Sequence, residues 1–492
     1  MIKLTNEKAL EFDTLFEKRK QEILTTKDNL KITGTAYYVS NNGDDNNDGK
    51  TDATAWKTLK KVHTADLKHG DGVFFKRGGI FRGCFHTKAG VTYAAYGEGD
   101  KPRIYAGDKN LADKDLWEIY DKEHNIWKLK EKHLCVGTLV FNEGEACSRK
   151  LIPSFKDGKY VCRNDKSKEF DIVRDMTEDL DVFWYYVDTL TDGEYKVPKL
   201  VDEALGDLYL RCDKGNPGEV YSSIEPLARR HTIRSSENKD VVIDNICFKY
   251  IGMHAIAAGG NCVPNLTVTN CEFGWIGGSI QFYHSNAEDQ QRCGSVVRFG
   301  NAIEIYGGCK GYIARNNYIY EVYDAGITHQ VGSPNKIMQE DIEYSDNIIE
   351  NCVYAIEYFL GQGGEEKGKI KNCVMKNNFL RRSGYGWGKQ RPDITCPSLI
   401  KSWDATNLSE NFVIKDNIFD RSTQTYLHIS ALNEEDFPTV DNNTYIQNLD
   451  GPLGLFGASK NGRSKMYKFD QNAEETIKTI IGDKNAKVYY IE

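Results

Sequence analysis

Two neighbouring stretches of the chain are variants of one motif: residues 316–330 read NNYIYEVYDAGITHQ, and residues 345–359 read SDNIIENCVYAIEYF. Each contains an Asn, a short apolar run and a Gly-Ile or Ala-Ile step. They differ in their acidic residues, because the first copy carries Asp324 and the second carries Glu357. A motif that recurs at this distance indicates a repeat architecture, and this must be weighed before any single motif is interpreted.

The motif recurs along the chain from about residue 240 onward. Its anchoring residues are Asn245, Asn270, Asn317, Asn347, Asn378 and Asn417. Their spacing predicts a coil of roughly 25 residues with insertions, and we expect the longest gap, between Asn270 and Asn317, to contain an extra coil. Coils that bury their apolar faces only by stacking form a solenoid, and coils made of strands form a parallel β-helix. Stacked Asn side chains would hydrogen-bond from coil to coil.

Glycine and proline usage agrees with an all-β chain. The 492 residues include 44 Gly and only 11 Pro, which favours many short strands joined by tight turns. Thr5 is a plausible N-cap for an amphipathic helix over residues 5–25. We therefore expect an N-terminal helical cap (1–30), first β-helix coils (31–110), inserted β-rich excursions (111–235), main coils with a groove (236–465) and a C-terminal cap (466–492).

Three stretches near the N-terminus carry a resemblance to a known superfamily. They are YYVSNNGDDNNDG (37–49), AWKTLKKV (55–62) and GDGVFFKRGGIFRG (70–83). Together with the Asn coils they resemble the pectate-lyase-like right-handed parallel β-helix superfamily. RFGNAIEIYGG (298–308), EVYDAGITHQ (321–330) and YAIEYF (354–359) resemble its glycoside hydrolase branch more than its lyases. The resemblance implies a glycan-processing β-helix, whose relatives include enzymes active on xylosides, fucosides and lacto-N-biosides.

The strand that closes each copy predicts two outward columns of side chains. The expected core column is Ile256, Ile303, Ile327, Ile356, Ile400 and Leu427. Because side chains alternate between the faces of a strand, the next residue in each copy should point outward. That column reads Ala257, Glu304, Thr328, Glu357, Lys401 and His428, and the outward column two residues further on reads Gly259, Tyr306, Gln330, Phe359, Trp403 and Ser430.

Carboxylates beside aromatic rings suit a groove that binds and cleaves sugars. We predict Asp324, Glu357 and Glu304 as catalytic residues, with Asp324 as nucleophile or base, Glu357 as acid, and Glu304 in support or exchanging roles with them. Glu304 and Glu357 lie two coils, about 9.6 Å, apart, near the upper limit for inverting enzymes. Asp324, in a turn that Gly326 allows to be tight, would approach either one at the roughly 5 Å of retaining enzymes.

Further residues are expected to bind the substrate. They are His329, Gln330, Tyr306, Phe359, Lys401, Trp403, His254, Trp387 and Arg382. Two of the assignments leave an alternative open, because strict alternation turns His329 toward the core and because Asp324 could hydrogen-bond its own turn. Trp387 and Arg382 belong to the stretch RRSGYGWGKQR (381–391), which we expect to overhang the groove.

The bulk properties exclude several classes of partner. A net charge of −8 argues against a nucleic-acid partner, and no apolar segment has the length of a membrane span. The N-terminus has no apolar signal region, and 13 Cys without CxxC pairs suit free thiols, so we expect a cytoplasmic protein. We expect no metal and no cofactor, since HExxH, GxxxxGK[ST] and GxSxG are all missing from the sequence. The oligomeric state is left open.

Three functions remain in competition. The first is a glycosidase acting on an oligosaccharide, exo-acting if the loops close the groove into a pocket. The second is a polysaccharide lyase with Lys401 as base, which would need a basic groove and an Asp cluster for calcium. The acidic cluster Asp341, Glu343 and Asp346 reads instead as a surface turn. The third is a glycan-binding β-helix without catalysis.

Overall fold

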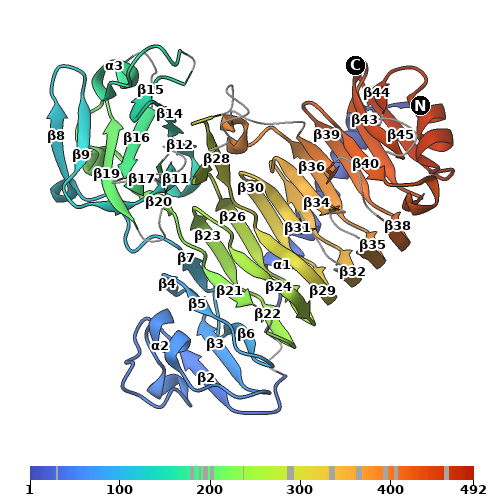
Figure 1. Ribbon diagram of the computed structural model, residues 1–492. Coiled ribbons are helices and arrows are strands. Elements are labelled where there is room, and N and C mark those ends of the chain that lie inside the picture. Colours follow the sequence, from blue (N-terminus) through green and yellow to red (C-terminus); the bar gives the residue numbers. More distant parts are fainter. Residues whose placement is uncertain are drawn as a thin grey trace.

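The structure is a computed structural model. It describes residues 1–28, 31–163, 165–177, 182–187, 190–191, 198–199, 204–236, 238–284, 293–331, 338–361, 368–391, 397–403, 408–458 and 465–492. Parallel strands stack coil upon coil along the length of the molecule, from the N-terminal coils to the C-terminal end (Figure 1). The chain is thus a parallel β-helix, as the repeats predict.

Each coil contributes strands to three faces. The first face contains β7 (Arg103–Tyr105), β23 (Cys247–Ile251), β26 (Glu272–Ile276), β30 (Tyr318–Val322), β33 (Ile348–Glu350), β36 (Phe379–Ser383), β39 (Ile418–Ser422), β42 (Thr444–Asn448) and β45 (Lys487–Ile491). The second contains β5 (Phe85–His86), β21 (Ile233–Ser236), β24 (Ile256–Pro264), the first half of β29 (Ile303–Arg315), β31 (Ala325–Val331), β34 (Tyr354–Leu360), β37 (Ser398–Ser402), β40 (Leu427–Ala431) and β43 (Gly451–Ala458). The third contains β3 (Gly72–Lys76), β6 (Thr92–Tyr96), β22 (Val241–Asp244), β25 (Leu266–Thr269), the second half of β29, β32 (Met338–Ser345), β35 (Lys369–Lys376), β38 (Ser409–Lys415) and β41 (Thr439–Asp441).

The predicted core column is confirmed by the strand register of the second face. Ile256, Ile303, Ile327, Ile356, Ile400 and Leu427 pair in succession and are all fully buried. The residues after them are therefore in register as well, and alternation directs these toward the outside of the second face. This register brings the predicted carboxylates onto neighbouring coils.

An Asn ladder runs along the corner before the first face, but its membership differs from the prediction. Asn317, Asn347, Asn378, Asn417 and Asn443 bond in succession, each amide oxygen accepting from the backbone N–H of the Asn one coil earlier. At the start of the ladder, Cys271 N–H donates to Asn317 Oδ1 (3.0 Å).

Asn270 and Asn245 therefore do not belong to the ladder. Asn270 stands one residue earlier in the coil, beside Asn316. Its Oδ1 accepts a hydrogen bond from Asn316 Nδ2 (2.6 Å). Asn245 pairs with the same position because Asp244 is in register with Thr269. Both residues have positive φ, as do Asn316 and Asp346, so this position makes the turn itself. The prediction was wrong by one residue because two adjacent polar positions repeat.

The longest gap does not contain an extra coil. β24 pairs directly with β29, and β26 pairs directly with β30. Between β26 and β29 the chain forms an antiparallel pair, β27 (Ser279–Tyr283) and β28 (Val296–Phe299). The additional residues are thus an excursion, and residues 285–292 within it lie outside the described residues.

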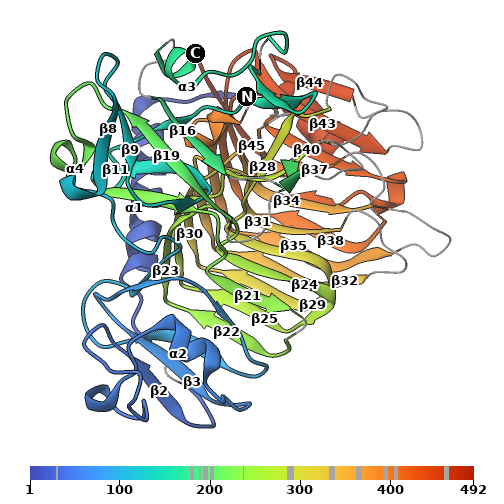
Figure 2. The ribbon, with the colours of Figure 1, turned by 60° about the vertical axis from the view of Figure 1, so that its left-hand side comes forward.

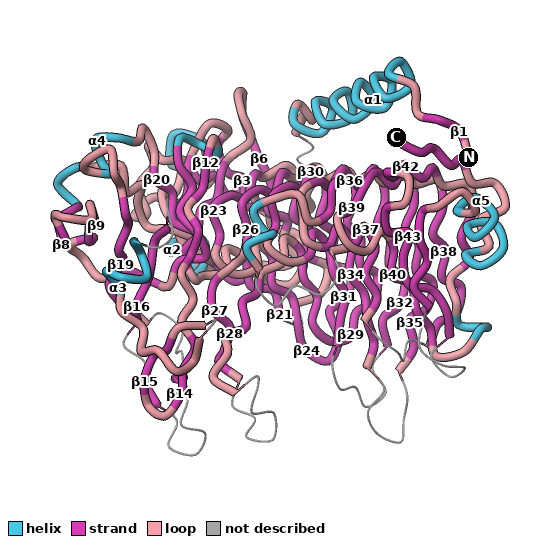
Figure 3. Tube along the Cα trace, turned by 90° about the horizontal axis from the view of Figure 1, so that it is seen from above, coloured by secondary structure: helices cyan, strands magenta, loops and turns pink. Residues whose placement is uncertain are grey.

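The helices cover different parts of the solenoid. α1 (Asn6–Leu24) starts at Thr5, whose side chain accepts from Lys8 N–H, and lies along the outside of the first face (Figure 3). Its Phe16 and Ile23 pack on Phe379 and neighbouring residues of that face, so α1 shields a sheet and does not plug the end of the solenoid. The buried side chains of α2 (Leu59–Thr64) join the core and α2 contacts β5 near the N-terminal end.

The C-terminal segment joins the same core at the other end. α5 (Ala473–Thr476) runs into a π-helical turn, Ile477–Ile481. Ala473, Ile477 and Ile481 are buried in the main core. Strand β1 (Ile2–Lys3) pairs with β45 beside them, so both chain termini meet at this end (Figure 1).

A separate sheet stands beside the first coils. It contains β8 (Trp117–Asp121), β9 (Ile126–Leu129), β10 (His133–Leu134), β13 (Arg149–Lys150), β16 (Val182–Val187) and β19 (Leu205–Arg211). β11 (Val136–Phe141), β12 (Ala146–Cys147) and β20 (Ile224–Ala228) link it to the first face, because β20 pairs with both β11 and β23. Figure 2 shows this sheet projecting from the solenoid above α2.

Two further properties concern the described residues alone. Their cysteines are all free of disulfide bonds. None of their helices has the length and apolarity required to cross a membrane.

Candidate active site

Three carboxyl groups gather on consecutive coils of the second face. Glu304 lies on β29 and Glu357 on β34, each paired with Thr328 of β31 between them. Asp324 comes immediately before β31, in the bend that enters this face. Gly326 lies within β31, where an added Cβ would meet Ala355 O at 2.7 Å, so this glycine permits close stacking on the next coil rather than a tight turn.

Glu357 is buried although it points out of the core. Its relative exposure is 3%, and Trp403 Nε1 donates a hydrogen bond to Oε1. Burial and the negative charge of Asp324 raise the pKa of Glu357 to about 8, against the weaker opposing effects of the Trp403 hydrogen bond and the Arg391 charge. Glu357 therefore holds its proton at neutral pH.

Asp324 is a paired carboxylate. Arg391 Nη1 donates to Asp324 Oδ1 at 2.6 Å, and the side chains of Arg391 and Asp324 are largely buried, at 11% and 14% exposure. Charge-assisted hydrogen bonds of this kind are short and strong. The guanidinium thereby balances the charge of Asp324 next to the protonated Glu357.

Glu304 is held by Asn301 and lies close to His254. Asn301 Nδ2 donates to Glu304 Oε2 at 2.5 Å, and His254 Nδ1 lies 2.9 Å from the same oxygen. Asn301 also accepts from Ala325 N–H (2.8 Å) through Oδ1 and donates its own N–H to His254 Nδ1 (2.9 Å). Asn301 thus fixes Glu304 relative to the bend that carries Asp324.

The side chains of the second outward column differ in their exposure to solvent. Tyr306 is 51% exposed, while Gln330, Phe359 and Trp403 are partly buried. Lys401 is buried and its Nζ lies 4.5 Å from the centre of the Trp403 ring.

The ammonium of Lys401 is also 2.8 Å from His428 Nδ1. Burial and the positive charge of Lys401 lower the pKa of His428 to about 3, so the imidazole is neutral and accepts from Lys401. Lys401 therefore contributes a charge one coil beyond Glu357, since it pairs with Glu357 in the register.

Two residues predicted to bind the substrate belong instead to the interior. His329 is fully buried, its Nδ1 lies 2.6 Å from Tyr344 Oη, and burial lowers its pKa to about 3. The burial of His329 agrees with strict alternation along the strand. The prediction that His329 binds the substrate was therefore wrong. Trp387 is 4% exposed, packs on Tyr323 and donates Nε1–H to Glu321 O (2.8 Å), so it anchors its loop.

Arg382 is not the arginine of the site. It occupies the corner at the end of β36 with φ of +58°, the same position as Glu321 and Arg421 in other coils. Arg391, nine residues later in the loop that follows β36, contacts Asp324 instead. Residues 381–391 thus contribute an arginine to the site, but it is Arg391 and not the predicted Arg382.

Sequence reasoning missed Arg391 and Asn301. Arg391 reaches Asp324 from a loop between two strands, so no alternation rule assigns its direction. Asn301 had a usable signal, because it stands three residues before Glu304 in the quoted stretch RFGNAIEIYGG. An Asn just before a strand that carries a carboxylate can bond both the carboxylate and the neighbouring turn.

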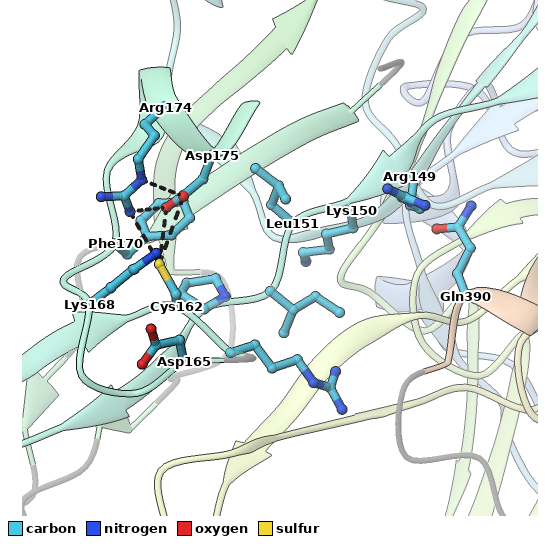
Figure 4. A pocket seen from close by; sticks show the side chains of 13 residues that line it. Arg149, Lys150, Leu151, Cys162, Asp165, Lys168, Phe170, Arg174, Asp175 and Gln390 are labelled. Atoms are coloured by element: carbon cyan, nitrogen blue, oxygen red, sulfur yellow. Dashed lines mark hydrogen bonds and ion pairs between the residues drawn. The ribbon is translucent and has the colours of Figure 1, made fainter. Parts of the chain in front are cut away.

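A cavity of about 400 Å³ lies apart from this column. It is lined by Arg149, Lys150, Leu151, Ile152, Pro153, Cys162, Arg163, Asp165, Lys168, Phe170, Arg174, Asp175 and Gln390 (Figure 4). Asp175 is tied by Arg174, which donates two hydrogen bonds to it at 2.9 Å. Among the lining residues, the two acids are accompanied by five basic side chains, so the paired carboxyls of the second face are the better place for acid–base chemistry.

One contact joins this cavity to the carboxyl groups. Gln390 Nε2 donates to Ser148 O at 2.9 Å, and the next residue is Arg391.

The described residues contain no group of three or more His, Cys, Asp or Glu arranged to hold a metal ion.

The arrangement combines a proton donor with a fixed carboxylate. Glu357 carries a proton in a poorly solvated position, and Asp324 is paired with the Arg391 guanidinium. The negative charges of Asp324 and Glu304 both raise the pKa of Glu357. Carboxyls whose environments separate their protonation states can divide acid and base roles.

Comparison with known proteins gives a partial likeness to one enzyme. The chain is 32% identical over 122 residues to a lacto-N-biosidase of Bifidobacterium longum subsp. longum, a match that covers 23% of this chain and 8% of that protein. No family model matches the chain.

Solved β-helix structures resemble the chain at low identity. A GH136 lacto-N-biosidase from Eubacterium ramulus aligns over 90% of this chain and 63% of its own, at 13% identity and a TM-score of 0.40. A structure described as a glycoside hydrolase aligns over 86% of this chain and 94% of its own, at 11% identity and a TM-score of 0.44. Both scores are below 0.5, so the fold is assigned from the strand pairing itself. The chain has a parallel β-helix fold.

Proposed function

We propose that the protein is a glycoside hydrolase that cleaves oligosaccharides on the second face, with Glu357 as general acid and Asp324 as nucleophile or base. The observation that carries the proposal is a buried, protonated Glu357 beside an Asp324 carboxylate held by Arg391. One carboxyl must protonate the leaving oxygen while the other acts on the anomeric carbon or on a water molecule. The partial likeness to a lacto-N-biosidase supports this class.

The surrounding residues have supporting roles in this proposal. Asn301 orients Glu304, which adds negative charge near the developing positive charge of the sugar. Tyr306 and Phe359 offer ring faces to the sugar C–H surfaces. The Gln390–Ser148 contact ties the Arg391 loop to the projecting strands, and this closure supports action at one end of the substrate.

We also propose a cytoplasmic location and therefore an oligosaccharide as the substrate. The support is the free state of the described cysteines, which suits a reducing compartment.

The test is hydrolysis of a panel of nitrophenyl glycosides and natural oligosaccharides by wild type, Asp324→Asn and Glu357→Gln. We expect reducing-sugar release by wild type and a loss of about 10²- to 10⁴-fold in kcat with natural oligosaccharides in each variant. Glu410→Gln is the matched control, because Glu410 pairs with Lys369 at 3.1 Å on the exposed third face.

Product chemistry separates this function from its rival. An unsaturated product, seen by its ultraviolet absorbance, that persists in both variants and vanishes in Lys401→Ala would replace the hydrolase with a lyase. Tight glycan binding without any product would replace it with a binding protein.

A further inference from the structure

One acidic side chain near the carboxyl groups has no role in the proposed function. It is Glu321 of β30, three residues before Asp324, at the corner between the first and second faces. The strand register gives the neighbouring coils Trp275, Asn351 and Arg382 at the same corner position. All four corner residues have positive φ, a conformation that Asn adopts more readily than Glu. The shape of the corner therefore does not explain a carboxyl at Glu321.

Glu321 holds the loop that carries Arg391. Trp387 N–H donates to Glu321 Oε2 (2.8 Å), and the indole N–H of Trp387 donates to the carbonyl oxygen of Glu321 (2.8 Å). One loop residue is thus bound by both the side chain and the main chain of Glu321. Trp387 begins the helical turn Trp387–Gln390, which ends directly before Arg391.

This loop fits closely against the corner and is bonded internally. A Cβ added to Gly386 would lie 2.5 Å from Glu321 Oε2. At the end of the turn, Arg391 N–H donates to Gly388 O (2.8 Å). A displacement of Trp387 would therefore be transmitted through the turn to Arg391.

Glu321 and Asp324 bind the two ends of the turn. Glu321 accepts from Trp387 N–H, and Asp324 accepts from Arg391 Nη1 four residues further on (2.6 Å). The two acids are separated by only two residues, between the end of β30 and the bend before β31. Two short segments are thus joined at two points, and the contact at Glu321 helps to set the position from which Arg391 reaches Asp324.

The carboxyl of Glu321 is poorly solvated. Burial raises its pKa to about 7, although the hydrogen bonds from Trp387 and Asn351 lower the pKa. The charged and titratable groups that face it from the surrounding elements are Cys147, Glu350, Cys352 and Lys389. Carboxyls with such a perturbed pKa cluster at functional sites.

We propose that Glu321 is a positioning residue of the active site, whose carboxyl group holds the Trp387–Gln390 turn and thereby keeps Arg391 against Asp324. Its role in turnover rests on the proposed glycosidase function, but the positioning of the loop can be measured without substrate. Loss of this support would let the Arg391 charge move away from the carboxyl pair. Since that charge lowers the pKa of Glu357, its departure would raise this pKa further.

The first experiment measures the pH profile of kcat/KM for wild type, Glu321→Ala, Arg391→Ala and the double variant. We expect Glu321→Ala to lose about 10- to 100-fold near neutral pH. The alkaline limb, which reports the ionisation of Glu357, should move upward by about one pH unit. Arg391→Ala should show both changes at least as strongly, and the double variant should be no worse than Arg391→Ala. Glu321→Gln keeps an acceptor for Trp387 N–H and should restore most of the activity.

The second experiment is hydrogen exchange without substrate. Exchange of the amides of residues 387–391 should accelerate about 10-fold in Glu321→Ala. Gly386→Ala crowds the same carboxyl from the loop side and should reproduce both the faster exchange and the shifted limb. Asp71→Asn is the matched control and should change neither, because Asp71 is a buried acid of the N-terminal coils that accepts two backbone N–H groups, each at 2.8 Å.

The outcomes separate the positioning role from the proposed function. Losses that add in the double variant, or an alkaline limb that stays in place in Glu321→Ala, overturn the proposal. Unchanged exchange of residues 387–391 overturns it as well. Where Glu321→Ala does not fold, as judged by circular dichroism, Gly386→Ala decides by the same two readouts. Faster exchange in the variants, together with a wild type that hydrolyses no glycoside, would support the positioning of the loop and refute only the proposed function.

Discussion

At the scale of single residues, the site separates two neighbouring carboxyl groups into different states. Glu357 is nearly inaccessible to water, and desolvation together with the charge of Asp324 disfavours its ionised form. Asp324 has the Arg391 guanidinium against one oxygen. Burial and the neighbouring charge of Asp324 thus keep the proton on Glu357, although the Trp403 hydrogen bond and the Arg391 charge act in the opposite direction.

The raised pKa of Glu357 has a consequence for stability. It moves from the ordinary 4.5 to about 8, so between these pH values the folded chain holds a proton that the unfolded chain has lost. Stability must then fall as pH rises through this window. We expect the Tm of Glu357→Gln to gain on wild type by a few degrees between about pH 5 and about pH 8.

Calorimetry across this pH range checks the prediction. Glu410→Gln, whose carboxyl lies on the surface, should show no such gain. A Tm difference between Glu357→Gln and wild type that stays constant with pH would mean that Glu357 is ionised throughout.

The sequence predicted the residues whose direction follows from strand alternation. Glu304, Glu357 and Lys401 are on the expected column because their neighbours Ile303, Ile356 and Ile400 form the core. It did not predict Arg391, which reaches the site from a loop. A loop side chain is directed by contacts such as Gln390 with Ser148, which join segments far apart in the chain.

At the scale of elements, the coils are joined by the buried Asn ladder. The side chain of Asn347 accepts from Asn317 N–H (3.1 Å) and donates to Ala314 O (2.8 Å) and to Asn378 Oδ1 (3.0 Å). The ladder therefore satisfies backbone groups at a corner where strands end.

Asn347→Ala should destabilise the protein by about 1–3 kcal/mol for each buried partner left without a hydrogen bond. Denaturant unfolding measures the loss, and hydrogen exchange should accelerate at Asn317 N–H. Asn46→Ala, at an exposed turn, is the control, with an expected change within about 0.5 kcal/mol. Equal effects of the two substitutions would show that the ladder adds nothing to stability.

Repeat spacing predicted this element but not its exact register. Asn270 and Asn317 both precede an apolar run, yet only Asn317 occupies the ladder, and Cys271 fills the equivalent position one coil earlier. Two adjacent polar positions with different backbone roles look alike in a sequence. The strand pairing separates them, because Thr269 is in register with Arg315.

At the scale of the whole molecule, the solenoid needs its end coils covered. A stack of coils gains stability from neighbouring coils, so an uncovered end coil exposes core side chains. Ile477 and Ile481 of the C-terminal turn are buried in the main core, while Ile480 between them is 46% exposed.

This pair provides a matched test of the C-terminal covering. Ile477→Ala should cost about 2–5 kcal/mol because it opens a buried cavity. Ile480→Ala should change stability by no more than about 0.5 kcal/mol. Hydrogen exchange should rise first in β42, β43 and β45 of the Ile477→Ala protein, and protection that stays uniform along the solenoid would contradict this role.

The overall β-helix followed from the repeats, and excursions were expected over residues 111–235, but the strand pairings within the excursions were not predicted. β27 and β28 interrupt one coil, and the separate sheet around β16 and β19 departs from the first coils, with pairings that have no period in the sequence. Their partners are fixed by long-range contacts alone, as at β11 and β20.

The central claim is that Glu357 delivers a proton to the leaving group while Asp324 acts at the sugar. The most direct measurement is kcat/KM of Glu357→Gln and Asp324→Asn on two substrates with the same sugar, one with an alkyl alcohol and one with dinitrophenol as leaving group. Dinitrophenolate leaves without protonation, so Glu357→Gln should retain near wild-type activity on that substrate and lose about 10²- to 10⁴-fold on the other, while Asp324→Asn loses activity on both. Equal losses of Glu357→Gln on the two substrates would contradict the account.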